Sequence, residues 1–330
     1  MSEFPFYRPL GSKPPEGEVE LPSITLQRHI SPEGYIADKG LASAVNTALL
    51  LGEPLLLTGH PGTGKTQLAY NLAWQLGLNS PLRFQAKSTS RAQDLFYTYD
   101  SLGRFHRTIN DDGNSLNYIR YQALGLAIIL ANQPETVSSV LPTNSHHTGQ
   151  ARSVVLIDEI DKAPRDFPND VLRELETMQF DIPELGGKVV EASDAFRPIV
   201  VITSNSDRQL PDAFLRRCIY YHIQFPESEQ LRMIVRSRLG VEFSAIEPFL
   251  SDALELFEKL HHQETPLAKP PSTAELISWL TALQRMAKDG FHPLSKRERV
   301  FAVTNSLLLK NREDQMLAKP IIENWFKWSR

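Results

Sequence analysis

The sequence contains a single cysteine, Cys218, in 330 residues. One cysteine excludes an internal disulfide and is typical of a protein in a reducing compartment. Long hydrophobic runs are also missing, because the clearest one in the middle of the chain, residues 124–131, is far too short to cross a bilayer. The first residues lack the charged-then-apolar pattern of a signal peptide. We therefore expect a cytoplasmic protein without a membrane span.

A strong excess of charge of either sign is absent as well. The chain has 35 Lys and Arg against 39 Asp and Glu, which leaves a net charge of −4. Nothing in this balance indicates a nucleic acid or an anionic membrane surface as partner, and we expect neither. Length and composition are those of a globular protein of about two domains with a substantial core.

The most informative stretch that is present is Gly59–Thr66, which reads Gly-His-Pro-Gly-Thr-Gly-Lys-Thr. It follows an apolar run, 54–58, and precedes a helical pattern that starts at Gln67. Strand, glycine loop, Lys-Thr and helix in this order form a Walker A motif. The glycines allow several N–H groups to converge on one point, and the helix N-terminus favours phosphate there. The sequence therefore predicts a nucleotide-binding protein.

Individual roles follow from this motif. Lys65 is expected to reach the terminal phosphates, and the Thr66 hydroxyl is expected to bind Mg²⁺. The predicted nucleotide-binding residues of the stretch are Gly59, Pro61, Gly62, Thr63, Gly64, Lys65, Thr66 and Gln67.

A second motif consists of four apolar residues, 154–157, followed by Asp158 and Glu159. We expect this strand to lie beside the strand of the phosphate loop, which would place both acids at the carboxyl edge of the sheet. Asp158 would then hold the Mg²⁺ that Thr66 also binds, and Glu159 would activate water as general base.

Two further candidates lie downstream. Asn205 closes the apolar strand 199–202 and either serves as a turn residue or points its amide at the γ-phosphate, if that strand lies between the other two. Arg216 and Arg217 end a short helix before the strand 219–223. They either solvate the end of that helix or act as an arginine finger on a neighbouring subunit.

The order of these patterns predicts an α/β protein with a parallel sheet covered on both faces, because apolar strands alternate with helices up to about residue 226. We expect strands at 54–58, 82–86, 153–157, 199–202 and 219–223. Gly186-Gly187 predicts a hairpin over 181–191, and a helix is expected from Leu116 to Leu130. A turn is expected at 101–103 and a surface loop at 136–150.

Three segments divide the chain. Residues 1–22 are rich in Pro, Gly and Glu and are expected to form an extended, disordered arm, with docking on a neighbouring subunit as the alternative. Residues 23–226 form the α/β domain, and 227–330 form a small all-α lid domain whose last expected helix lies near 300–307.

The motifs in this order, followed by a helical lid, resemble the core of an AAA+ ATPase, and more narrowly the MoxR family. The resemblance covers about residues 24–290 and is carried by Gly34–Ala37, Asp158–Pro164 and Asp212–Cys218. It implies ATP as the nucleotide, a homo-oligomeric, hexameric ring, and chaperone-like remodelling of a partner protein. Members of the family commonly work with a protein that bears a von Willebrand factor A domain.

The resemblance also assigns residues. It implies that Tyr35 and Ile36 lie near the adenine, that Asn205 is sensor 1, and that Arg217 or Arg216 is the finger. The family's insertion in the second helix would fall near 95–108. One departure concerns the lid, where the family usually has a sensor 2 arginine: this chain has Ala274 near that position, and Lys269 is the nearest cation.

Two other functions stay open at this level. The missing lid arginine favours a nucleotide-dependent switch or scaffold with little turnover. A DNA-acting ring ATPase would use cations near the inserted segment to line a pore. Those cations are Arg83, Lys87, Arg91, Arg104 and Arg107.

Overall fold

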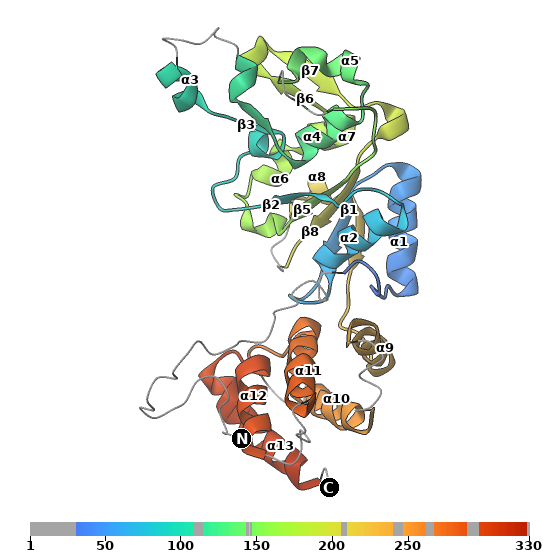
Figure 1. The fold of residues 1–330 in the computed structure, drawn as a ribbon, viewed down its shortest axis with the longest axis vertical. Coiled ribbons are helices and arrows are strands. Elements are labelled where there is room, and N and C mark those ends of the chain that lie inside the picture. The colour runs from blue at the N-terminus through green and yellow to red at the C-terminus, as the bar shows by residue number, and fades with distance from the viewer. Residues whose placement is uncertain are drawn as a thin grey trace. The chain divides into compact units, whose positions relative to one another are not determined.

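Five parallel strands form the sheet at the centre of the structure. They are β1 (Leu55–Thr58), β2 (Leu82–Gln85), β5 (Val154–Asp158), β8 (Ile199–Thr203) and β9 (Ile219–His222). Their order across the sheet is β2-β5-β8-β1-β9, and Figure 1 labels the first four of these strands. All five strands expected from the sequence are confirmed, as is the α/β fold with a parallel sheet.

The computed structural model describes residues 31–107, 115–142, 145, 147–205, 210–239, 247–261, 267–288 and 297–328. The expected arm at 1–22 lies outside these residues. The chain divides into two units, Met1–Ser31, of which Ser31 alone is described, and Pro32–Arg330.

Alternate residues of the central strands enter two different cores, because successive side chains of a strand point to opposite faces. Leu55, Leu57 and Leu156 pack with α1 (Lys39–Leu51) and α2 (Lys65–Gln75) on one face. Leu56, Val155 and Ile157 pack with helices on the other face, which are α4 (Ala123–Leu130), α6 (Phe167–Asp170) and α7 (Leu172–Thr177). The sheet is therefore covered on both sides, as the apolar strands predicted.

The expected position of the strand that ends in the two acids was wrong. Strand β5 does not pair with β1, because β8 lies between them and pairs with both. Burial identifies the edge strands, since β2 and β9 are alternately half-buried and exposed, but β1, β5 and β8 are all mostly buried. An apolar pattern therefore could not decide which of β5 and β8 lies beside β1. Strand β8, which Asn205 follows, therefore lies between β5 and β1, as the expected role of Asn205 near the γ-phosphate requires.

Two antiparallel pairs lie outside the central sheet. Strand β6 (Gln179–Ile182) pairs with β7 (Lys188–Glu191), which confirms the hairpin expected around Gly186-Gly187. Strand β3 (Tyr97–Tyr99) pairs with β4 (Ile119–Tyr121). This second pair was not predicted.

Several expectations in the segment around β3 and β4 were wrong. The turn expected at 101–103 is the start of α3 (Ser101–Arg107), and the helix expected from Leu116 begins only at Ala123. Residues 119–121 have an apolar pattern that also suits a helix, but pairing with β3 draws them into a strand. The segment 136–150, expected to be a surface loop, begins with the end of a short helix, α5 (Pro134–Val137).

After α8 (Asp212–Leu215) and β9 the described elements are all helices. They are α9 (Ser228–Leu239), α10 (Glu247–His261), α11 (Thr273–Lys288), α12 (Arg297–Leu308) and α13 (Arg312–Trp328). Helix α13 was missed, because Pro320 lies inside it and proline ordinarily ends a helix. Its buried residues Ala318, Ile322 and Trp325 follow helical spacing, and this pattern could have identified it. None of the helices among the described residues has the length and apolar character that a membrane span requires.

Candidate active site

The phosphate loop connects β1 to α2 at the carboxyl end of the sheet. Gly59 has φ 139°, and a Cβ atom at this position would lie 2.5 Å from the carbonyl oxygen of Ile223, so only glycine fits. Gly64, with φ 91°, precedes the first turn of α2, and a Cβ atom there would lie 3.2 Å from the ring of Tyr35. The loop is thus shaped by close approaches of backbone and an aromatic ring.

Lys65 is buried, with 5% of its surface exposed. Its Nζ donates hydrogen bonds to the carbonyl oxygens of Gly59 and His60, at 2.8 Å each. Burial lowers the pKa of the ammonium group to about 8, and the nearby acids Asp161, Asp158 and Glu159 act against this shift. The ammonium group is therefore held inside the curve of the phosphate loop.

Asp158, the last residue of β5, is 2% exposed and accepts four hydrogen bonds. Its Oδ1 accepts from the hydroxyls of Thr66, at 2.9 Å, and Thr203, at 2.7 Å. Its Oδ2 accepts from Nη2 and Nε of Arg83, at 2.6 and 3.1 Å. Thr66 and Asp158, the two residues expected to bind Mg²⁺, are therefore in direct contact, and hydroxyl and carboxylate oxygens are the donors that Mg²⁺ prefers.

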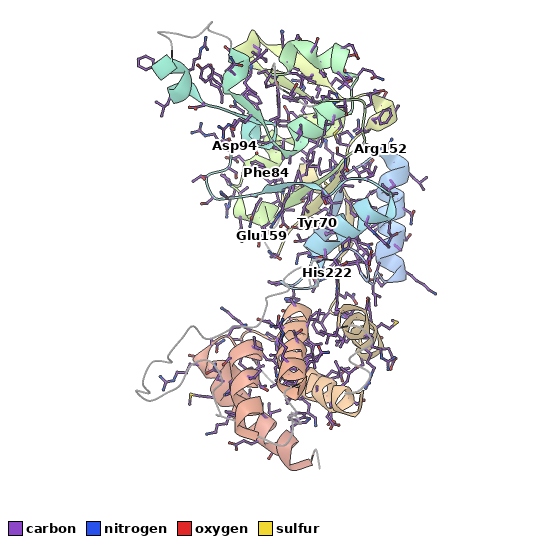
Figure 2. All side chains as sticks on the ribbon, viewed as in Figure 1. Tyr70, Phe84, Asp94, Arg152, Glu159 and His222 are labelled. Carbon is purple, nitrogen blue, oxygen red and sulfur yellow. The ribbon has the colours of Figure 1, made fainter. Side chains whose placement is uncertain are left out.

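Glu159 follows at once in a left-handed backbone conformation, with φ 56° and ψ 50°, which is uncommon for a residue other than glycine. Its Oε1 accepts a hydrogen bond from Nδ2 of Asn205 at 2.9 Å. Its Oε2 accepts from Nζ of Lys162, at 2.5 Å, and from Nε2 of Gln85, at 3.2 Å. Figure 2 labels Glu159 at one edge of the sheet and Arg152, which precedes β5, at the other.

Thr203 and Asn205 connect β8 to both acids. The Thr203 hydroxyl donates to Asp158 and accepts from the backbone N–H of Glu159 at 2.9 Å. The backbone N–H of Asn205 donates to Oδ1 of Asp161 at 3.0 Å. Strand β8 therefore holds the backbone of the turn after β5 as well as the side chain of Glu159.

Two residues of β2 were not recognised as part of this site. Arg83 was considered only as a pore-lining cation, and Gln85 was given no role. Their side chains share a face of the edge strand, and the register pairs Gln85 with Asp158. A polar residue at every second position of a strand whose neighbour ends in two acids is the pattern that could have found them.

Arg216 and Arg217 lie at the opposite edge of the sheet. They precede β9, which runs parallel to β1, and the N–H of Ile219 donates to the carbonyl oxygen of Pro54, just before β1. The phosphate loop begins where β1 ends, about 13 Å further along the strand direction. The structure therefore does not bring these arginines to the phosphate loop of their own chain.

The surroundings of the two arginines are specific. Nε of Arg217 forms an ion pair with Oε1 of Glu176, and Nη1 donates to the carbonyl oxygen of Ala213 at 3.0 Å. A cavity of about 390 Å³ lies here, lined among others by Leu51, Arg197 and both arginines. The cavity is thus lined by several arginines, and the two acids at the end of β5 are not part of its lining.

Two other candidates have surroundings that suit a ligand. Tyr35 is partly buried against Gly64, and burial raises the pKa of its hydroxyl. Oε1 of Gln67 is buried and has no hydrogen-bond partner among the described residues, so it can accept one from a ligand.

The Thr63 hydroxyl makes a contact within the phosphate loop, since its Oγ1 donates a hydrogen bond to the carbonyl oxygen of His60 at 2.9 Å. Ile36 and Thr63 are partly buried, and Pro61 is exposed. Ala274, near the expected position of a sensor 2 arginine, lies in the first turn of α11.

A glycine loop that opens a helix at the end of a central parallel strand, with two acids two strands away at the same edge, defines a nucleoside-triphosphate-binding protein of the P-loop class. Residues 54–218 match the model of the AAA domain family, dynein-related subfamily. The chain belongs to this family. It is an ATP-binding ATPase, a nucleoside-triphosphate hydrolase.

Other comparisons are distant. A single-site variant of Thermotoga maritima RuvB is 16% identical with a TM-score of 0.46, over 87% of this chain and 75% of RuvB. The structure of the Thermotoga maritima RuvB Holliday junction branch migration motor is 15% identical with a TM-score of 0.42, over the same shares. None of the curated proteins compared with the chain matches it.

Proposed function

We propose that this ATPase hydrolyses ATP with Mg²⁺ held by Thr66 and Asp158. The observation that carries the proposal is the hydrogen bond between these two residues, 2.9 Å long, at the mouth of the phosphate loop. Bound Mg²⁺ would neutralise charge on the β- and γ-phosphates. The backbone of Gly59 and Pro61–Gly64 and the Lys65 ammonium would bind the phosphates, with Tyr35, Ile36 and Gln67 toward the rest of the nucleotide.

Glu159 is the proposed general base, and Asn205 is the residue that orients it and senses the γ-phosphate. A base must lie within hydrogen-bond reach of the water it activates, and its carboxylate must be free to accept the proton. The three donors on Glu159 restrain the carboxylate, and the one from Asn205 comes from the strand between β5 and β1. This arrangement supports a general base whose carboxylate changes position when the Asn205 amide turns from Glu159 to the γ-phosphate.

Arg217, with Arg216 beside it, is the proposed arginine finger and acts on a neighbouring subunit. Since both precede β9, they are remote from their own phosphate loop, and a second copy is needed to bring an arginine and a γ-phosphate together. The side chains of Arg217 and Glu176 are 42% and 48% exposed, so their ion pair is worth less than about 1 kcal/mol. Arg217 can therefore exchange Glu176 for a phosphate of a neighbouring subunit at little energetic cost. A finger that acts on a neighbour in this way supports a homo-oligomeric ring, and the MoxR-type assignment gives it six subunits.

The finer assignment we propose is a MoxR-type ATPase that remodels or activates a partner protein, one with a von Willebrand factor A domain. It rests on the three family-like stretches and on the β3–α3–β4 segment, which lies at the place of the family's insertion. We propose 23–226 as the ATPase domain, 227–330 as the lid and 1–22 as an extended arm, and the single cysteine favours the cytoplasm.

A nucleotide-dependent switch is the second candidate, and Ala274 favours it. The first turn of α11 contains an acid, Glu275, and no arginine. A lid without that cation has less to gain from contact with a γ-phosphate. A turnover rate in the ordinary range for ATPases would eliminate the switch.

The test is the steady-state rate of ATP hydrolysis per subunit over a wide range of protein concentration, without a partner. We expect a steep rise to a plateau, because assembly completes each site. Arg217→Ala subunits, inactive alone, should regain part of the activity when mixed with Lys65→Ala subunits, since one type retains an intact phosphate loop and the other an intact finger. The same mixture with Arg216→Ala identifies which arginine acts. No rescue at any mixing ratio would contradict a finger that acts on a neighbour.

A further inference from the structure

The edge strand β2 delivers a cation to the buried acid that ends β5. Arg83 pairs with Leu156 in the register, two residues before Asp158, and its side chain lies on the face of the sheet that α2 covers. Nη2 and Nε reach the same oxygen of Asp158, Oδ2, at 2.6 and 3.1 Å. The contact is therefore made by the planar fork of the guanidinium and not by one nitrogen.

The two partners differ in exposure. The side chain of Asp158 is 3% exposed and that of Arg83 is 41% exposed. A carboxylate taken out of water needs an opposite charge or full hydrogen bonding. The hydroxyls of Thr66 and Thr203 supply neutral donors to Oδ1, whereas Arg83 supplies the positive charge on Oδ2. Because Arg83 reaches Asp158 from the solvent side, it can leave without disturbing the core.

We propose that Arg83 is a positioning residue that acts as a tethered counter-cation of Asp158 and competes with the divalent metal. When no metal is bound, the guanidinium neutralises Asp158 and keeps Oδ1 turned toward Thr66. A divalent cation at Oδ1 is then repelled by the arginine on the same carboxylate. Nucleotide phosphates add the negative charge that lets the metal bind, so Arg83 makes metal binding depend on nucleotide. The inference rests on the Mg²⁺ assignment to Thr66 and Asp158 in the proposed function.

This role requires an arginine. Lysine would keep the charge but lose the second nitrogen of the fork, so it would hold Asp158 less firmly. Glutamine would keep a hydrogen-bond donor and lose the charge. The two substitutions therefore separate neutralisation from hydrogen bonding.

The experiment measures Mn²⁺ binding to the full chain without nucleotide, by electron paramagnetic resonance of the free ion. Mn²⁺ stands in for Mg²⁺ because it is paramagnetic and prefers oxygen ligands. We expect Arg83→Gln to bind Mn²⁺ at least about tenfold more tightly than the wild type, and Arg83→Lys to lie between them, since a positive charge on the same carboxylate repels the metal ion. Arg120→Gln, an exposed arginine on β4, is the matched control and should equal the wild type. With a non-hydrolysable ATP analogue the difference should shrink.

Thermal unfolding gives a second measurement that does not depend on turnover. Added Mn²⁺ should raise the unfolding temperature of nucleotide-free Arg83→Gln more than that of the wild type, because a ligand that binds the native state more tightly stabilises it more. Equal Mn²⁺ affinity in wild type and folded Arg83→Gln, or in Arg83→Lys if the glutamine variant does not fold, would overturn the role of Arg83 alone. Absence of Mn²⁺ binding in all variants even with the ATP analogue would overturn the metal assignment as well.

Discussion

Asn205 donates a hydrogen bond from Nδ2 to Oε1 of Glu159 across 2.9 Å, from the end of one strand to the end of the next. The two residues are separated by 46 positions in the sequence. Strands β5 and β8 pair in parallel, so residues that follow them meet at the carboxyl edge of the sheet. The contact links the proposed base to the strand beside the phosphate loop.

Asn205→Ala should lower the rate of ATP hydrolysis about 10- to 100-fold while the affinity for ATP changes little. Without the amide, the Glu159 carboxylate keeps Lys162 and Gln85 as partners and turns away from the phosphate side, so a general-base contribution of about 10²–10⁴ is partly lost. Steady-state kinetics and binding of a fluorescent ATP analogue would separate the two effects. Asn46→Ala, an exposed asparagine on α1, serves as control. A loss of ATP affinity equal to the loss of rate would mean that Asn205 acts in binding.

Lys65→Ala and Glu159→Gln should have different defects. The lysine variant should lose ATP affinity by about 100-fold, since Nζ is the positive charge inside the phosphate loop. The glutamine variant should bind ATP normally and hydrolyse it at least about 100-fold more slowly, because an amide cannot accept the proton. Titration with the ATP analogue, followed by single-turnover kinetics, distinguishes these outcomes. Equal loss of binding in both variants would show that the roles are assigned wrongly.

Leu51→Asp should weaken assembly. Leu51 is 61% exposed and lines the same cavity as Arg216 and Arg217, so a subunit that approaches the finger would cover it. Because a charged side chain at this position removes the apolar contact that Leu51 would make, we expect the concentration at which ATPase activity rises to increase at least about tenfold. Leu102→Asp, 71% exposed on α3, is the control. Equal behaviour of both variants would place the subunit contact elsewhere.

The thiol of Cys218 should react slowly with iodoacetamide in the native protein. Burial raises the pKa of this thiol from 9.0 to about 12, and the charge of Glu53 adds to the shift. Since the thiolate is the reactive form, its fraction at about pH 8 falls about 1,000-fold. The rate, followed by mass spectrometry, should rise about tenfold per pH unit up to about pH 11, and protein unfolded in urea should react rapidly at about pH 8. Fast reaction of the native protein under the same conditions would contradict the raised pKa of this partly buried thiol.

Much of the protein was predictable because its signals are local. The phosphate loop requires glycines at particular backbone angles next to Lys-Thr, and each of the inner strands β1, β5 and β8 is an apolar run that is buried on both faces. Walker A, the two acids at the end of β5 and the five strands could therefore be recognised from consecutive residues alone. The periodicity of Ala318, Ile322 and Trp325 is a local signal too, although Pro320 concealed it.

The tertiary structure decided which of these local pieces meet. Nothing in the sequence of β5 or β8 specifies that β8 lies beside β1, since both strands are buried and apolar, and the order depends on how all the helices cover the sheet. The alternation of Arg83 and Gln85 indicates a polar face of β2, but only the pairing of β2 with β5 identifies Asp158 as the partner of Arg83, 75 positions away. Hydrogen bonds and ion pairs between distant residues depend on strand order and register, and in this chain only the folded sheet determines both.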